Sequence, residues 1–109
     1  MKPRIMYIEL KTHPGGHDDH GPARIGRVTY SDSGKTIYYR GKRFRRCKLF
    51  CGNHYDVDTG DEYWISGCKK NGQDRHPVGG GPVEIDADVR EEYWTTIRDQ
   101  PEKRKERFA

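Results

Sequence analysis

The sequence lacks any apolar run long enough to cross a bilayer, and its first residues, MKPRIMYIEL, lack the apolar centre of a secretion signal. These absences predict a cytoplasmic protein with no membrane partner. Cysteine is scarce as well, since the chain contains only Cys47, Cys51 and Cys68. An odd number of cysteines favours reduced thiols over a disulfide framework. Only 31% of residues are hydrophobic, so we expect the core to rely on large side chains such as Trp94.

The length of 109 residues is typical of one domain, which can bury a modest core without metals or disulfides. We expect residues 1–100 to form this single domain. The charged residues 101–109 begin with a proline that ends the preceding helix, and we expect them to be frayed.

Acidic residues are absent from Lys35 to Phe50, whereas the chain as a whole contains 17. This segment carries seven basic residues, which exceed the net charge of +4, so the rest of the chain is net negative. The positive excess is therefore local, and a local excess can form a binding face.

Alternating apolar residues predict short β-strands in the first half of the chain. Residues 4–10 place Met6 and Ile8 on one face of a strand. Residues 23–30 alternate only if the phase changes once, which predicts a β-bulge at Gly26.

Turn signals separate the predicted strands. SDSG is a turn, and Gly41 permits a reversal between KTIYYR and KRFRRCKLF. The triplet DTG predicts a three-residue hairpin loop in which Tyr55 faces Tyr63. Asn71 and Gly72 predict a further two-residue hairpin.

A helix is expected after the flexible PVGGGP segment, from about Asp88 to Arg98. Asp88 is the expected N-cap and Asp86 the alternative, with Tyr93 and Ile97 on the apolar stripe.

These elements predict a mainly β (α+β) protein. We expect a small antiparallel meander sheet, or an SH3-like, partly open barrel, of about five to seven strands with one C-terminal helix. The expected core consists of Met6, Ile8, Ile25, Val28, Ile37, Trp64 or Ile65, Tyr93 and Ile97.

Several runs, among them MYIELKT, GKTIYYRGK, YDVDTGDEYWISG and GPVEIDADVREEYW, together resemble a family of short, uncharacterised bacterial proteins. Some members of this family carry the label deoxyxylulose-phosphate synthase. The resemblance spans most of the chain and implies a self-contained domain, but it supplies no catalytic residue.

Four side chains are candidate zinc ligands, namely Cys47, Cys51, His54 and Cys68. Their spacing does not distinguish a zinc site from plain thiols, because two cysteines four residues apart on a strand lie roughly 13 Å from each other. In the histidine-rich loop, His13, His17, Asp18, Asp19 and His20 could gather a divalent metal or simply form a solvated loop.

A small enzyme could pair Cys68 or Asp74 with His76 as nucleophile and base. A chain this short and polar has little material to enclose a pocket, so we expect no enzymatic activity and no cofactor.

The basic segment interleaves aromatic rings with cations, an arrangement that can bind nucleic acid by stacking and charge. The candidate residues are Tyr38, Phe44, Arg40, Lys42, Arg43, Arg45, Arg46 and Lys48. The opposing interpretation is that the rings face the core and the charges protect an edge strand. We expect a binding module whose partner is nucleic acid or an acidic protein, with a protein-interaction role as the alternative.

Overall fold

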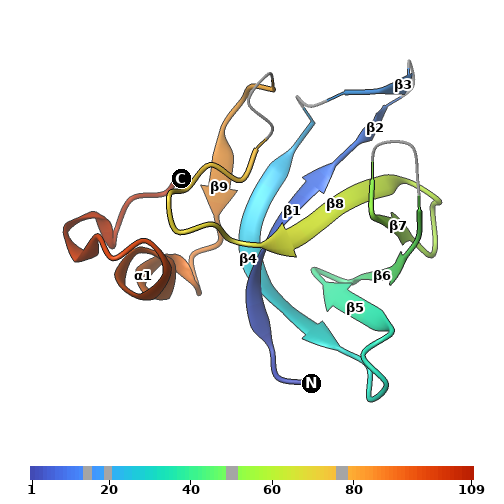
Figure 1. Cartoon of the computed structure of the whole chain (residues 1–109), viewed down its shortest axis with the longest axis horizontal. Helices are drawn as coiled ribbons and strands as arrows, with labels where there is room; N and C mark the ends of the chain where they lie inside the picture. The colour runs from blue at the N-terminus through green and yellow to red at the C-terminus, as the bar shows by residue number, and fades with distance from the viewer. Residues whose placement is uncertain (14–15, 19–20, 49–51, 76–78) are drawn as a thin grey trace.

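The computed structural model describes residues 1–13, 16–18, 21–48, 52–75 and 79–109. Its central feature is a closed six-stranded antiparallel β-barrel with one additional strand (Figure 1). The strands are β1 (Arg4–Leu10), β2 (Thr12–His13), β3 (Gly16–His17), β4 (Ala23–Tyr30), β5 (Thr36–Tyr39), β6 (Lys42–Arg46), β7 (His54–Asp56), β8 (Glu62–Gly67) and β9 (Val83–Ile85). Around the barrel their order is β1-β8-β7-β6-β5-β4, and β9 adds to β4 in parallel. The predicted mainly β fold with one short C-terminal helix is confirmed.

The barrel closes because β4 pairs with β1 through six residue pairs. Both strands carry buried residues on both faces. Met6 and Val28 point into the barrel, whereas Tyr7 and Ile25 point outward into a second apolar cluster. This double burial explains why Tyr7, expected opposite the core face, is fully buried.

The predicted bulge at Gly26 is wrong. The β1–β4 register runs without interruption from Arg4 opposite Val28 to Glu9 opposite Ala23. The apolar pattern changes phase because β4 contributes Ile25 to the outer cluster and Val28 to the barrel interior. A strand that contributes apolar residues to two clusters on opposite faces shows the same change of phase in its apolar residues as a strand with a bulge.

Three predicted turns are present. In SDSG, the Gly34 amide donates to the Ser31 carbonyl at 2.8 Å, and Gly41 reverses the chain between β5 and β6. Gly60 has a φ of 79°, as the DTG loop requires, but the pairing prediction is wrong by one residue, since Tyr55 lies opposite Glu62 rather than Tyr63. The loop is longer than three residues because the Asp56 carboxylate accepts the amides of residues 58 and 59.

At Asn71–Gly72 the chain turns, with the Gly72 amide 3.1 Å from the Lys69 carbonyl. The flanking residues 69–70 and 73–74 form no strands, so the prediction of a hairpin there is wrong. The Asp74 carboxylate instead accepts the Lys69 amide at 2.7 Å and closes this loop on itself.

The predicted core is largely confirmed, because seven of its members are buried: Met6, Ile8, Ile25, Val28, Ile37, Ile65 and Tyr93. Of the two alternatives on β8, Ile65 faces the barrel interior and Trp64 is 39% exposed. Ile97 is only partly buried at the margin of the outer cluster.

The helix is shorter and differently capped than expected. It begins with α1 (Arg90–Glu92), continues as a π-helical turn, η1 (Tyr93–Ile97), and its N-cap is Val89, with no side-chain hydrogen bond. The capping predictions for Asp88 and Asp86 are therefore wrong, and the Asp86 carboxylate binds other side chains. The wider turn lets Tyr93 and Trp94, which are neighbours in sequence, both pack on the β1–β4 wall.

The helices formed by the described residues are too short and too polar to cross a membrane.

Residues 101–109, expected to be frayed, instead fold back along β9. They start with a 3₁₀ turn, η2 (Pro101–Lys103). The Ile85 amide donates to the Arg107 carbonyl at 2.8 Å, and the Ala109 amide donates to the Val83 carbonyl at 2.9 Å. The Trp94 indole also donates to the Glu106 carbonyl at 3.0 Å, so this segment is part of the fold.

Removal of residues 107–109 should lower the free energy of unfolding by about 1–3 kcal/mol, because two backbone hydrogen bonds and the Arg107–Glu84 ion pair are lost. Urea denaturation followed by tryptophan fluorescence measures this change. The exposed Lys105→Ala variant is the control and should leave the midpoint unchanged. An unchanged midpoint for the truncated chain would show that the tail does not contribute to stability.

Candidate functional site

The outer surface beside the β5–β6 turn contains a groove of 390 Å³. It is lined by residues 38–43 together with Arg27 and Thr29 from β4. Four of these side chains are cations, and none of the described lining residues is acidic. The groove thus brings the basic residues of the β5–β6 hairpin together with Arg27 of β4.

Strand alternation orients the residues of this groove. Tyr38 and Arg43 are cross-strand partners that both point outward, whereas their neighbours Ile37 and Phe44 form the adjacent inward pair. Arg40 and Gly41 connect the strands with φ values of 48° and 77°, the two positive angles of a tight hairpin turn. The turn therefore presents Arg40 at the rim of the groove.

Each groove cation has an acidic neighbour outside the groove. The N–O distances are 2.9 Å for Arg27–Glu92, 3.3 Å for Arg40–Asp86, 3.6 Å for Lys42–Asp56 and 2.7 Å for Arg43–Asp58. The cationic side chains are 36–55% exposed. The Arg27–Glu92 and Arg43–Asp58 pairs are exposed on both sides and contribute only about 0–1 kcal/mol each, so an incoming anion can replace these two carboxylates at low cost. The carboxylates of Asp86 and Asp56 are buried, so Arg40 and Lys42 keep these partners and contact an anion through their remaining N–H donors.

Of the two predicted aromatic contacts, one is accessible. Tyr38 is 41% exposed and lines the groove. The prediction that Phe44 is a surface stacking ring is wrong, because Phe44 is fully buried and packs edge to face against Tyr63 at 4.8 Å between ring centroids. The alternation along β6 turns Phe44 inward while its neighbours Arg43 and Arg45 face solvent.

The remaining predicted cations are exposed but lie outside the groove. Arg45 shares the outward face with Arg43, and its Nε donates to Thr36 Oγ1 at 3.3 Å. Arg46 lies opposite His54, and Lys48 follows the end of β6. Sequence reasoning missed Arg27, because only the three-dimensional pairing of β4 with β5 brings this residue beside the basic hairpin.

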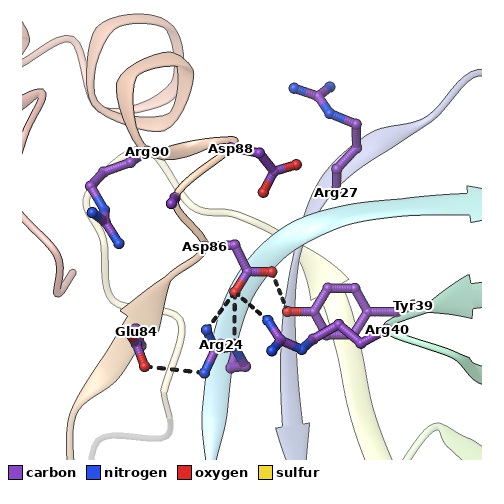
Figure 2. A pocket seen from close by; sticks show the side chains of 9 residues that line it. Arg24, Arg27, Tyr39, Arg40, Glu84, Asp86, Asp88 and Arg90 are labelled. Atoms are coloured by element: carbon purple, nitrogen blue, oxygen red, sulfur yellow. Dashed lines mark hydrogen bonds and ion pairs between the residues drawn. The ribbon is translucent and has the colours of Figure 1, made fainter.

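A second pocket, of 520 Å³, adjoins the groove and lies between β4, β9, the β5–β6 turn and the segment leading into α1 (Figure 2). At its base, three side chains converge on Asp86. Arg24 donates through Nε and Nη2 at 2.8 and 2.7 Å, Arg40 donates through Nη1 at 3.3 Å, and the Tyr39 hydroxyl donates at 2.5 Å. Burial, reinforced by the Asp86 carboxylate, raises the pKa of Tyr39, so the phenol stays protonated and keeps donating.

Glycine at position 26 allows Tyr39 to reach Asp86. A Cβ atom at this position would lie 2.5 Å from Tyr39 Cε1 and 2.7 Å from its hydroxyl, and would also collide with the Asp86 carboxylate. Tyr39 therefore crosses β4 where the strand has no side chain, a known use of glycine within a sheet. Sequence reasoning assigned this glycine to a bulge and missed its packing role.

The candidate zinc ligands are not gathered by the described part of the chain. His54 is buried at the end of the barrel with Nδ1 2.8 Å from Asn53 Oδ1, whereas Cys68 packs at the edge of the outer cluster that contains Tyr93. Cys51 lies outside the described residues. Among the residues that are described, no three His, Cys, Asp or Glu side chains are grouped as metal ligands.

The remaining site predictions fall partly outside the described residues. These include His76 of the proposed catalytic pairs, Asp19 and His20 of the histidine-rich loop, and the side chains of His13 and His17. Burial, and then the nearby Asp74 carboxylate, raises the pKa of the Cys68 thiol to about 12, so it is protonated and a poor nucleophile at neutral pH.

A buried ionic cluster on β1 was not foreseen from the sequence. Glu9 is 1% exposed, accepts a hydrogen bond from the Tyr7 hydroxyl at 2.5 Å, and pairs with Lys11 at 2.8 Å and with Arg75 at 3.6 Å. Arg75 also donates to the Gly21 carbonyl at 2.9 Å. The cluster fastens the segment after β8 to β1.

Comparisons of the chain with protein-family models, curated proteins and solved structures found no match.

Gly26→Ala should destabilise the protein by about 1–3 kcal/mol, because Tyr39 and Asp86 must move to accommodate the new methyl group. Gly67→Ala is the matched control, because its nearest neighbour would be the flexible end of Arg4 at 3.3 Å. Urea denaturation midpoints compare the two variants. Equal midpoints would show that the Tyr39–Asp86 contact does not depend on the glycine.

His54 should make stability depend on pH. Burial, and then the charge of Arg46, lowers the pKa of His54 from 6.5 to about 4. The unfolded chain binds this proton below pH 6.5 and the folded chain does not, so stability is complete above pH 6.5 and falls as the pH drops toward 4, by up to about 1.4 kcal/mol per pH unit. In His54→Gln, urea midpoints should fall less steeply between these limits. Parallel curves for the variant and the wild type would contradict this assignment.

Proposed function

We propose that the protein is a non-enzymatic, cytoplasmic binding module that holds single-stranded nucleic acid in the groove on the outer face of β4, β5 and β6. The observation that carries this proposal is the position of Tyr38. Its exposed ring stands among four cations in a groove whose described lining has no carboxylate. Rings beside cations are the combination with which proteins bind unpaired bases and phosphates.

The cations support binding to a phosphate backbone. Arg27 comes from β4, Arg40 from the β5–β6 turn, and Lys42 and Arg43 from β6, and all four line the groove. Contacts between these cations and phosphates release counterions from the nucleic acid, which favours binding at low salt. Arg45 extends the same basic face beyond the groove.

Tyr38 favours single strands over duplexes. A base can stack on a tyrosine ring only when it is not already paired and stacked within a helix. The groove volume of 390 Å³ is also suited to one nucleotide rather than to a double helix. Stacking on a single ring tolerates any base, so the groove itself carries little sequence preference.

An acidic protein is the alternative partner, and Trp64 favours it. This side chain is 39% exposed on the outer face of β8, away from the groove, with its indole N–H donated to Ser66 Oγ at 3.2 Å. Exposed tryptophan is enriched in protein interfaces. Such a partner would use the same cations but would not require Tyr38.

The Lys42→Ser, Arg43→Ser, Arg45→Ser triple variant should bind a fluorescein-labelled single-stranded oligonucleotide more weakly. Each lost phosphate contact removes about 0.7 from the slope of log affinity against log salt, so the slope should decrease by about 2.

Tyr38→Ala should lower affinity about tenfold, because a base stacked on an aromatic side chain contributes roughly 1–3 kcal/mol, and should leave the slope unchanged. Fluorescence anisotropy across a salt series measures both quantities.

The control is a Lys69→Ser, Lys70→Ser, Lys105→Ser variant, which removes the same charge from exposed positions outside the groove. It should retain the wild-type slope. No binding by the wild-type protein at low salt would end the nucleic-acid proposal and leave the acidic protein partner ahead. Equal losses in the two triple variants would show that binding depends on net charge and not on the groove.

A further inference from the structure

The 520 Å³ pocket above Asp86 adjoins the groove and shares part of its lining. Arg27, Tyr39 and Arg40 line both cavities, so a strand held along the groove passes the entrance of the pocket. The pocket lies within the size range of small-molecule sites and can admit a base turned away from the strand.

Two carboxylates of the pocket are already bound to the protein. Asp86 receives Arg24, Arg40 and Tyr39, as Figure 2 shows. Glu84 pairs with Arg24 at 3.1 Å and with Arg107 at 2.6 Å. These groups form the base of the pocket and have little capacity left for a ligand.

Asp88 and two arginines remain available. Asp88 is exposed, lines the pocket and has no hydrogen-bond or ion-pair partner among the residues that the structure describes. In Figure 2 its carboxylate lies on the side of the pocket that faces Arg27. Arg27 bonds to Glu92 through Nη2, and Arg90 bonds to the Ile85 carbonyl, which leaves other N–H donors of both guanidinium groups for a ligand.

From this arrangement we propose that the pocket binds a guanine base of the strand held in the groove, an inference that rests on the proposed function. An ionised carboxylate only accepts hydrogen bonds, and guanine is the one common base with two adjacent donors, N1–H and the N2 amino group. The adjacent edge of the base carries the O6 and N7 acceptors, which arginine recognises. Asp88 binds the donor side, and Arg27 binds the acceptor side.

Phosphate and the other bases fit this pocket less well. Asp88 repels a phosphate, which the acid-free groove accommodates better. Adenine and cytosine each offer a single amino group next to a ring acceptor, and that acceptor would face the carboxylate. Uracil has one donor between two acceptors. A carboxylate for the donor edge, together with an arginine for the acceptor edge, therefore selects guanine.

Labelled oligouridylates that carry one central guanine, inosine, 7-deazaguanine, adenine or cytosine test this inference by fluorescence anisotropy. The guanine strand should bind about tenfold more tightly than the adenine and cytosine strands. Inosine lacks the N2 amino group and 7-deazaguanine lacks N7, so each should lose part of the preference. Equal affinity for all these strands would overturn the guanine assignment and leave the groove proposal intact.

Asp88→Asn should abolish the guanine preference without weakening the binding of plain oligouridylate, because Asp88 lies outside the basic groove. Asp32→Asn, in the exposed β4–β5 turn, removes the same charge and should retain the preference. A guanine preference that survives in Asp88→Asn would overturn the role of this carboxylate.

Free guanosine monophosphate distinguishes a base within a strand from a mononucleotide ligand. It should displace the guanine strand only at concentrations far above those of an unlabelled guanine strand, because it makes few groove contacts. Displacement at equal concentrations would overturn the assignment to a strand. No binding of plain oligouridylate by the wild type at low salt would instead remove the groove proposal, and this inference with it.

Discussion

The pairing of β1 with β4 is the constraint on which the rest of the structure depends. This one antiparallel ladder closes the barrel, and because it carries buried apolar residues on both faces it also supports the outer cluster of Val89, Tyr93 and Trp94. A register shift by one residue would exchange the side chains that face the two cores. Two separate apolar clusters therefore fix the same register. The positions of β9, the helix and the candidate site depend on this register, because all three lie against β1 or β4.

Asp86 makes the two neighbouring cavities differ in charge, because it lines the second pocket and not the groove. Its carboxylate holds Arg24, Arg40 and Tyr39, so much of the positive charge around the second pocket is neutralised at the base of that pocket. The neighbouring groove has no carboxylate in its described lining and stays basic. One acidic side chain, placed after β9, thus separates a region suited to phosphates from a region suited to the edge of a base.

Local sequence signals predicted the strands and turns well, because β1 and β4 alternate and Gly34, Gly41 and Gly60 adopt the positive φ angles that their turns require. The errors occurred where distant segments decide the outcome. Gly26 resembles a bulge until Tyr39 is seen to cross it, and Phe44 belongs to a basic run although its neighbours in space are apolar. In the candidate site, Tyr38 and the hairpin cations were accessible to sequence reasoning. Arg27, Asp86 and Asp88 were not, because they reach the site only through the pairings of β4 with β5 and β9.

The pairing of residues 107–109 with β9 also bears on solubility. In the seven-stranded sheet, β9 is the strand that the barrel leaves unpaired on one side, and an uncovered strand offers backbone donors and acceptors to a second molecule. The returning chain occupies these groups through Val83 and Ile85, and the Arg107 side chain pairs with Glu84 of the same strand. The closed barrel protects its own six strands, and the tail gives the seventh the same protection against intermolecular β-sheet formation and aggregation.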